Sequence, residues 1–274
     1  MNNNVVEKTV SFRCNESQLQ GIYHEVDNAT HGVIIVVGGP QSRVGSHRMF
    51  VDVARGLAKQ GITVFRFDYR GAGDSEGELQ PFTETVDDIN AAVLCFHQAY
   101  PKIRSVNLWG LCDAASAIAM YLDKYQGNQI TNVFMLNPWV KQTSTEAQAI
   151  LKYYYWQRLM DKTFWLKLLT GKFNPFKSAS DLVEHKKMAN TPSQSSFVDK
   201  MLSGLQAFQG NVHVFLSEND LTAQEFIALR QQSSSWSQLK IDAEIVINGA
   251  NHTFASPHWK QQIGSLTFNT IISS

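Results

Sequence analysis

The chain has 274 residues, of which 43% are hydrophobic and 18% are charged, and this suits one compact α/β domain with an insertion, or two small domains. Its 24 basic and 24 acidic residues balance, which predicts neither a nucleic-acid partner nor attraction to an anionic membrane. The three cysteines, Cys14, Cys95 and Cys112, are widely spaced, so we expect no disulfide framework and a reducing compartment.

Short β-rich runs alternate with longer helical patterns along the chain, which is typical of βαβ units and a mostly parallel sheet. The first two runs carry alternating apolar positions and predict an antiparallel hairpin. The expected strands are 8–14, 19–26, 32–39, 63–71, 105–110, 130–138, 212–217 and 243–247. Helices are expected over 48–60, over about 83–100 and from Asp113 onward. Further helices are expected between the last strands and after Pro257.

The stretch 140–209 interrupts this alternation with long, aromatic and basic helical patterns. It falls between two sheet strands, where the loops at the carboxyl ends of parallel strands form a binding crevice. We therefore expect a helical cap over a core made of residues 1–139 and 210–274. The alternative is a set of additional core helices.

The amino terminus, MNNNVVEKTV, has neither the basic nor the apolar region of a signal peptide. The longest apolar run, VIIVV at 33–37, is too short to cross a bilayer. We expect a cytoplasmic protein without stable membrane insertion. The sequence leaves the oligomeric state open, a homodimer included.

The segment VNLWGLCDAAS (106–116) has the pattern of a strand, a sharp turn and the start of a helix. A residue at the tip of such a turn adopts strained backbone angles, and the residues two positions away must be small. Gly110 and Ala114 meet this need around Cys112. The positive end of the following helix favours a thiolate, so the pattern predicts a nucleophile with a lowered pKa. A small buried cysteine at a strand end is the structural alternative.

Two further residues follow strands in the order that a nucleophile–acid–histidine triad requires. Asp220 comes just beyond the seventh expected strand, and His252 comes five residues beyond the eighth. Asp220 is also placed to cap the next helix, and His252 to be an ordinary loop histidine, while Glu218 is a reserve acid and His258 a weaker base. Because three strand ends in this order are uncommon by chance, we predict the triad Cys112–Asp220–His252.

Several segments resemble known families. The segment FDYRGAGDSEG (67–77) is similar to the loop that follows the fourth strand in α/β-hydrolases. The chain resembles these proteins over nearly its whole length. Four segments resemble the bacterial exosortase A system-associated hydrolases, namely GGPQSRVGSHR, GLCDAAS, LNPWV and YYYWQRLMDKTFWLKLLTGKFNP. The resemblance implies an α/β-hydrolase fold with an eight-stranded, mostly parallel sheet, flanking helices and a helical lid. It also implies that the cysteine is a family feature and that the protein is linked to exopolysaccharide production. Cysteine nucleophiles also occur in dienelactone hydrolases.

An oxyanion hole in this fold needs two backbone N–H donors, one after the nucleophile and one after the third strand. Asp113 would supply the first. The position that supplies the second in many superfamily members falls on Pro40, which has no N–H. Gln41 is therefore the candidate for the second donor, unless the loop is remodelled.

Three basic side chains, Arg43, His47 and Arg48, lie on the same loop and are candidates for binding an anionic group of the substrate. A solvated basic turn leading into a helix is an equally good interpretation.

The glycine-rich GAGDSEG matches no nucleotide-binding pattern, and no histidine–carboxylate motif indicates a metal, so we expect no cofactor. The leading hypothesis is hydrolysis of an ester, thioester or lactone, a small-molecule acyl substrate, through a cysteinyl thioester. Acyl transfer to a sugar hydroxyl or an amine is one alternative, and a non-catalytic scaffold is another. An intact triad argues against the scaffold, whereas Pro40 argues for it.

Overall fold

The computed structural model describes residues 5–39, 41–125, 129–140 and 196–274. The chain divides into two compact units, residues 1–140 with 197–274, and residues 141–196. The second unit is shorter than the insertion expected at 140–209, because residues 197–207 form a helix that packs within the first unit. The aromatic stretch at 153–175 lies outside the described residues.

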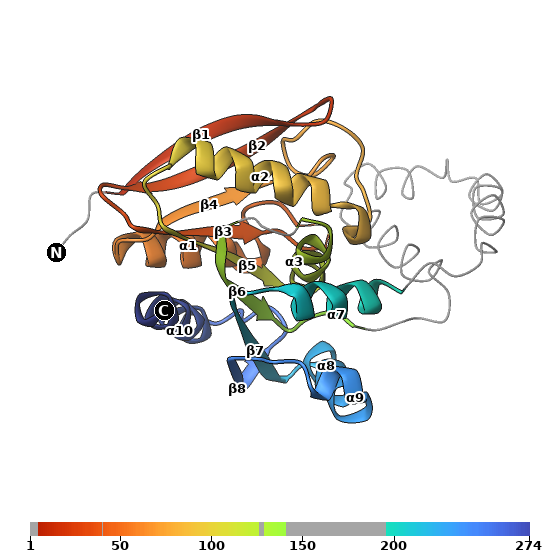
Figure 1. Ribbon diagram of the computed structural model, residues 1–274. Helices are drawn as coiled ribbons and strands as arrows, with labels where there is room; N and C mark the ends of the chain where they lie inside the picture. The colour runs from red at the N-terminus through yellow and green to blue at the C-terminus, as the bar shows by residue number, and fades with distance from the viewer. Residues whose placement is uncertain (1–4, 40, 126–128, 141–195) are drawn as a thin grey trace, which may run out of the picture. The chain divides into compact units, whose positions relative to one another are not determined.

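The first unit is built on one eight-stranded sheet in the order β1-β2-β4-β3-β5-β6-β7-β8 (Figure 1). β1 pairs with β2, and β2 with β4, in antiparallel fashion, and every other pair is parallel. This confirms the expected mostly parallel sheet. The strands are β1 (Val5–Cys14), β2 (Ser17–Val26), β3 (His31–Val36), β4 (Thr63–Phe67), β5 (Ser105–Leu111), β6 (Ile130–Leu136), β7 (Asn211–Asn219) and β8 (Ala243–Asn251).

Two strands differ most in length from the sequence-based expectation. β4 ends at Phe67 because the following loop turns through Gly71 and Gly73, which have positive φ angles of 70° and 55°. β8 continues to Asn251, which pairs with Asn219 beyond an irregularity in the register. His252 therefore follows its strand directly.

Helices cover both faces of the sheet. The described helices are η1 (Ser46–Arg48), α1 (Met49–Lys59), η2 (Phe82–Glu84), α2 (Val86–Ala99), α3 (Asp113–Lys124), α7 (Phe197–Ala207), α8 (Leu221–Gln232), α9 (Ser234–Ser237) and α10 (Pro257–Ser273). Helices α2, α3, α7, α8 and α9 contribute to one hydrophobic core, and α1 and α10 contribute to the other.

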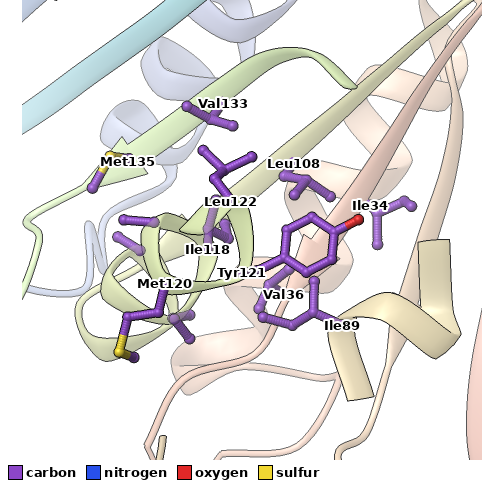
Figure 2. Close-up of a cluster of buried hydrophobic side chains, with 14 of the residues drawn as sticks. Ile34, Val36, Ile89, Leu108, Ile118, Met120, Tyr121, Leu122, Val133 and Met135 are labelled. Atoms are coloured by element: carbon purple, nitrogen blue, oxygen red, sulfur yellow. The ribbon is translucent and has the colours of Figure 1, made fainter. Parts of the chain in front are cut away.

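The central strands are buried on both faces, as a parallel sheet between helices requires. Along β3, Ile34 and Val36 point into the core with α2 and α3, whereas Val33 and Ile35 point into the core with α1 and α10. Figure 2 shows side chains of β3, β5 and β6 meeting those of α2 and α3 around Tyr121. This two-sided packing fixes the carboxyl ends of β5 to β8, from which the candidate site is built.

Arg66 and His24 form a buried polar pair within the sheet. The Nε of Arg66 donates to Nε2 of His24 at 2.9 Å, and both side chains are buried. His24 must therefore accept at Nε2 and carry its proton on Nδ1. Burial and the positive charge of Arg66 lower the pKa of His24 to about 4, against the nearby negative charge of Glu7.

We expect this histidine to make the fold sensitive to mild acid. Since its pKa is lowered on folding, the unfolded chain binds a proton between about pH 6.5 and 4 while the folded chain does not. The free energy of unfolding should therefore fall as the pH drops through that window, by up to about 3 kcal/mol. Urea unfolding at pH 7 and 4.5 should show this, and His24→Gln should reduce the difference. An unchanged difference in the variant would assign the sensitivity to other groups.

Candidate active site

Cys112 stands at the tip of a sharp turn between β5 and α3. Its φ and ψ are 61° and −122°, a strained conformation for a residue with a side chain. A Cβ on Gly110 would lie 2.8 Å from Ile118 Cδ1 and 2.9 Å from the carbonyl carbon of Ala114, so only glycine fits there. The structure thus confirms the turn that the sequence predicted and the reason for its small neighbours.

Backbone hydrogen bonds attach this turn to the end of β6. The N–H of Cys112 donates to the carbonyl of Leu136 at 2.8 Å, and the N–H of Trp139 donates to the carbonyl of Cys112 at 3.2 Å. The hydroxyl of Ser116, on the first turns of α3, donates to the carbonyl of Trp139 at 2.6 Å. The strained backbone at Cys112 is therefore held from both sides.

Asp220 and His252 form a hydrogen-bonded pair at the ends of β7 and β8. The Asp220 Oδ2 and the His252 Nδ1 are 2.9 Å apart. The Asp220 side chain is 7% exposed and that of His252 is 37% exposed. An ionised Asp220 can only accept, so the pair places the histidine proton on Nδ1 and leaves Nε2 free to take a proton.

Asp220 also caps α8, because its Oδ2 accepts the N–H of Ala223 at 3.2 Å. The two roles that the sequence left open for this residue are therefore compatible. The reserve residues lie elsewhere: Glu218 is exposed and accepts the N–H of Gly249 at 2.7 Å, and His258 is exposed on the first turn of α10.

A buried asparagine, which sequence reasoning did not identify, joins β6 to the segment that carries the histidine. The side-chain amide of Asn137 donates to the carbonyl of His252 at 3.0 Å and to the hydroxyl of Ser217 at 2.9 Å. Its Oδ1 accepts the N–H of Ser217 at 2.7 Å, and the Ser217 hydroxyl donates to the carbonyl of Asn251 at 2.9 Å. The available signal was a polar residue at the end of the apolar run VFMLN.

We expect Asn137→Ala to loosen the His252 segment. The change leaves a buried N–H and two acceptors without partners, which costs about 1–3 kcal/mol for a typical unsatisfied group. Turnover should fall more than this stability loss explains, because the imidazole is no longer held. The matched control is Asn132→Ala, which removes a buried asparagine from the start of β6. Equal activity losses in the two variants, measured below their melting temperatures, would contradict a specific role.

The electrostatic surroundings of Cys112 differ from the sequence-based expectation. Burial raises the pKa of its thiol well above the ordinary value, and the negative charges of Asp113 and Asp220 raise it further, against a hydrogen bond from the Asp113 N–H. The expected lowering of the pKa is therefore wrong for the resting protein. The helix N-terminus is present, but two carboxylates and the loss of solvent outweigh it.

The Asp113 side chain lies against the loop that follows β3. Its Oδ2 accepts the N–H of Gly39 at 2.8 Å, and its Oδ1 would lie 2.3 Å from a Cβ on Gly38. Burial raises the pKa of this carboxyl to about 6, although backbone N–H groups, including those of Gly39 and Ala114, and the charge of His252 act in the opposite direction. Gly38 is needed because this carboxyl occupies the space where its Cβ would lie, whereas Gly39 is favoured by its positive φ of 58°.

Gln41 uses its side chain to shape the loop, since its Oε1 accepts the N–H of Ser46 at 2.7 Å. Pro40 lies outside the described residues. The Gly39 N–H is directed at the Asp113 carboxyl, whose own backbone N–H lies near the Cys112 thiol. The loop after β3 and the turn at Cys112 thus meet at Asp113.

The three basic residues of the loop differ in their contacts and exposure. The Arg43 guanidinium pairs with the carboxylates of Asp68 and Asp74, so an anionic substrate group would compete with two charges already present. His47 and Arg48 are exposed and have positive φ angles of 51° and 61°. These contacts favour a structural role for Arg43 and leave only His47 and Arg48 facing solvent.

Among the residues that the structure describes, no three His, Cys, Asp or Glu side chains are grouped as a metal site. In the same part of the chain, no helix has both the length and the apolar character needed to cross a membrane. Cys14, Cys95 and Cys112 are all free thiols, and Cys14 is buried.

Comparisons with known proteins agree with this architecture. The profile of the alpha/beta hydrolase fold family matches residues 33–164. A search of curated proteins gives no significant match. The sheet order, the turn at Cys112 and the profile together define the class: this chain has the α/β-hydrolase fold.

Three solved structures show the extent of the similarity. Esterase Pf2001 of Pyrococcus furiosus is 17% identical, with a TM-score of 0.65 over 97% of this chain and 93% of that chain. The α/β-hydrolase GrgF of Penicillium sp. sh18 is 16% identical, with a TM-score of 0.66 over 98% of this chain and 100% of that chain. The dienelactone hydrolase of Anabaena variabilis is 14% identical, with a TM-score of 0.63 over 98% of this chain and 98% of that chain.

Proposed function

We propose that this protein hydrolyses a carboxylic ester, thioester or lactone through an acyl-enzyme on Cys112. The observation that carries the proposal is the 2.9 Å pair of Asp220 and His252, which follows β7 and β8 in the same sheet as β5, the strand that leads into the strained turn at Cys112. A nucleophile, a base and an orienting acid at the carboxyl ends of strands in one sheet are what acyl transfer on this fold requires. The names of two similar structures, an esterase and a dienelactone hydrolase, point to the same chemistry.

The raised pKa of Cys112 indicates how the reaction would begin. The resting thiol is neutral, so His252 must take its proton as the sulfur attacks the carbonyl carbon. The new S–C bond forms while the carbonyl electrons move to oxygen, giving an oxyanion. The oxyanion then collapses, the bond to the leaving group breaks, and His252 gives its proton to that group.

Water completes the cycle by attacking the thioester, with His252 accepting a proton from the water and returning it to the sulfur. Asp220 stabilises the imidazolium that forms in each half of the cycle and keeps the ring oriented. The partial exposure of the His252 ring leaves room for water at the base. That same exposure would admit a sugar hydroxyl or an amine, so acyl transfer is the second candidate.

The resemblance to the exosortase A system-associated hydrolases adds a context to this chemistry. We propose a role connected with bacterial exopolysaccharide production and an acyl group carried on a small molecule. The three free thiols favour a reducing compartment, which the cytoplasm would provide.

The test is turnover of a panel of p-nitrophenyl esters, acyl thioesters and lactones, with and without a sugar or an amine as acceptor. Hydrolysis without an acceptor supports the proposal. Release of the leaving group only when an acceptor is present would assign acyl transfer instead. If no substrate turned over and no acyl group attached to Cys112, the scaffold hypothesis would replace both.

A further inference from the structure

The Asp113 carboxyl belongs to a half-buried residue and is an ionisable group that the steps above do not use. It occupies the junction of the two segments that form the oxyanion hole in this fold, the loop after β3 and the turn at the nucleophile. Its Oδ2 accepts the Gly39 N–H at 2.8 Å, and its Oδ1 is packed against Gly38. The backbone N–H of the same residue lies beside the Cys112 thiol.

An ionised carboxyl at this position would oppose the proposed reaction. It would place a negative charge where the substrate oxygen must become negative, and it would occupy the Gly39 N–H. A neutral carboxylic acid behaves differently, because one oxygen accepts from Gly39 while the other carries a proton that it can donate. Protein sites do use a carboxylic acid kept neutral by burial as an oxyanion donor.

We propose that Asp113 is a further catalytic residue, whose protonated carboxyl donates a hydrogen bond to the oxyanion in place of the second backbone N–H that Pro40 lacks. This inference rests on the proposed function. The Asp113 proton stays on its oxygen throughout, so the hydrogen bond strengthens as the carbonyl oxygen gains charge, and no proton is transferred.

Burial supports the neutral form below about pH 6, the value to which it raises the pKa of Asp113. The charged or titratable groups that face this carboxyl are the Cys112 thiol on the turn and His252 after β8, and Asp220 acts on the same thiol. From the described part of the loop after β3, Gly38 and Gly39 lie against the carboxyl. A negative oxyanion beside the carboxyl would raise its pKa further and favour the donor form.

Two reactions at the same sulfur separate this role from others. Acylation by p-nitrophenyl acetate passes through an oxyanion, whereas alkylation by iodoacetamide does not. The ratio of the acylation rate to the alkylation rate therefore measures the contribution of the oxyanion donor. The dependence of the thiol's own reactivity on pH largely cancels in this ratio. Because a carboxyl donates only while protonated, the ratio in the wild type should fall as the pH rises through about 6 and beyond.

The variants are Asp113→Asn, whose amide accepts and donates at every pH, and Asp113→Ala, which does neither. Below about pH 6, where the wild-type carboxyl is protonated, we expect Asp113→Ala to acylate about 10²-fold more slowly, the loss typical for one oxyanion donor. Its alkylation should be little changed in that range, and equal to or faster than in the wild type at higher pH, where a negative charge beside the thiol is gone. Asp113→Asn should retain acylation at neutral pH and lose the pH dependence of the ratio. Asp27→Asn, at an exposed aspartate, is the matched control.

The inference fails if Asp113→Ala acylates as fast as the wild type, or if the ratio for Asp113→Asn falls with pH as in the wild type. In either case the proposed function stands, because Cys112 is still acylated. If the wild type forms no acyl adduct while Cys112 alkylates normally, the proposed function fails and this inference fails with it.

Discussion

Cys112→Ala is expected to lose essentially all ester turnover, by at least about 10³-fold, and to fold normally. The reason is that Cys112 is the nucleophile held at the turn between β5 and α3, and the charge of Asp220, the partner of His252, already acts on its thiol. Cys112→Ser should lose most of the activity, because its hydroxyl is harder to ionise than a thiol and sits on a shorter bond. The measurement is turnover of a short and a medium-chain p-nitrophenyl ester, with a thermal melt of each variant.

The melts also test the strain at the turn. With φ at 61° and ψ at −122°, residue 112 has a conformation that glycine adopts more easily than alanine. Cys112→Gly should therefore be more stable than Cys112→Ala, although both are inactive. Full activity in Cys112→Ala would remove the cysteine from the reaction.

Asp220→Asn is expected to reduce turnover by about 10³–10⁴-fold, the range seen when a triad acid becomes an amide. The amide can present its NH₂ group to Nδ1 of His252, which forces the ring proton onto Nε2, where the base must be free. Stability should fall by about 1 kcal/mol, because the same Oδ2 also accepts the N–H of Ala223, and an NH₂ group at that position leaves this helix-cap N–H without its acceptor. Steady-state kinetics and thermal melts of the same preparation provide both readouts.

The matched control for this variant is Glu218→Gln, two residues earlier in the chain. Glu218 is exposed and bound to the Gly249 N–H, which a glutamine oxygen can also accept. We expect nearly normal turnover. A larger loss in Glu218→Gln than in Asp220→Asn would exchange the roles of the two acids.

Much of this architecture could be predicted from sequence because its signals are local. Apolar runs such as VIIVV predict a strand buried on two faces, and β3 is one. Gly110 and Ala114 predicted the turn at Cys112 through the space they leave. The order of Asp220 and His252 after successive strands was sufficient to pair them, because parallel strands bring their carboxyl ends to one edge.

What could not be predicted depends on contacts between distant segments. The raised pKa of Cys112 comes from burial and from two carboxylates that the fold brings near it, and the helix N-terminus alone suggested the opposite. The sequence offered Arg43 as a candidate anion binder, and only the fold shows that Asp68 and Asp74 pair with it. The Asn137 network joins residues about 80 and 115 positions apart, which no local pattern reports.

The most direct test of the central claim is a search for the acyl-enzyme. The protein is mixed with p-nitrophenyl butyrate, quenched in acid within the first turnovers, digested and mapped by mass spectrometry. We predict one butyryl group on the peptide that contains Cys112, absent from Cys112→Ala, and no butyryl group on Cys14 or Cys95. Ester turnover without any adduct on Cys112, or an equal adduct on Cys95, would contradict nucleophilic catalysis by this cysteine.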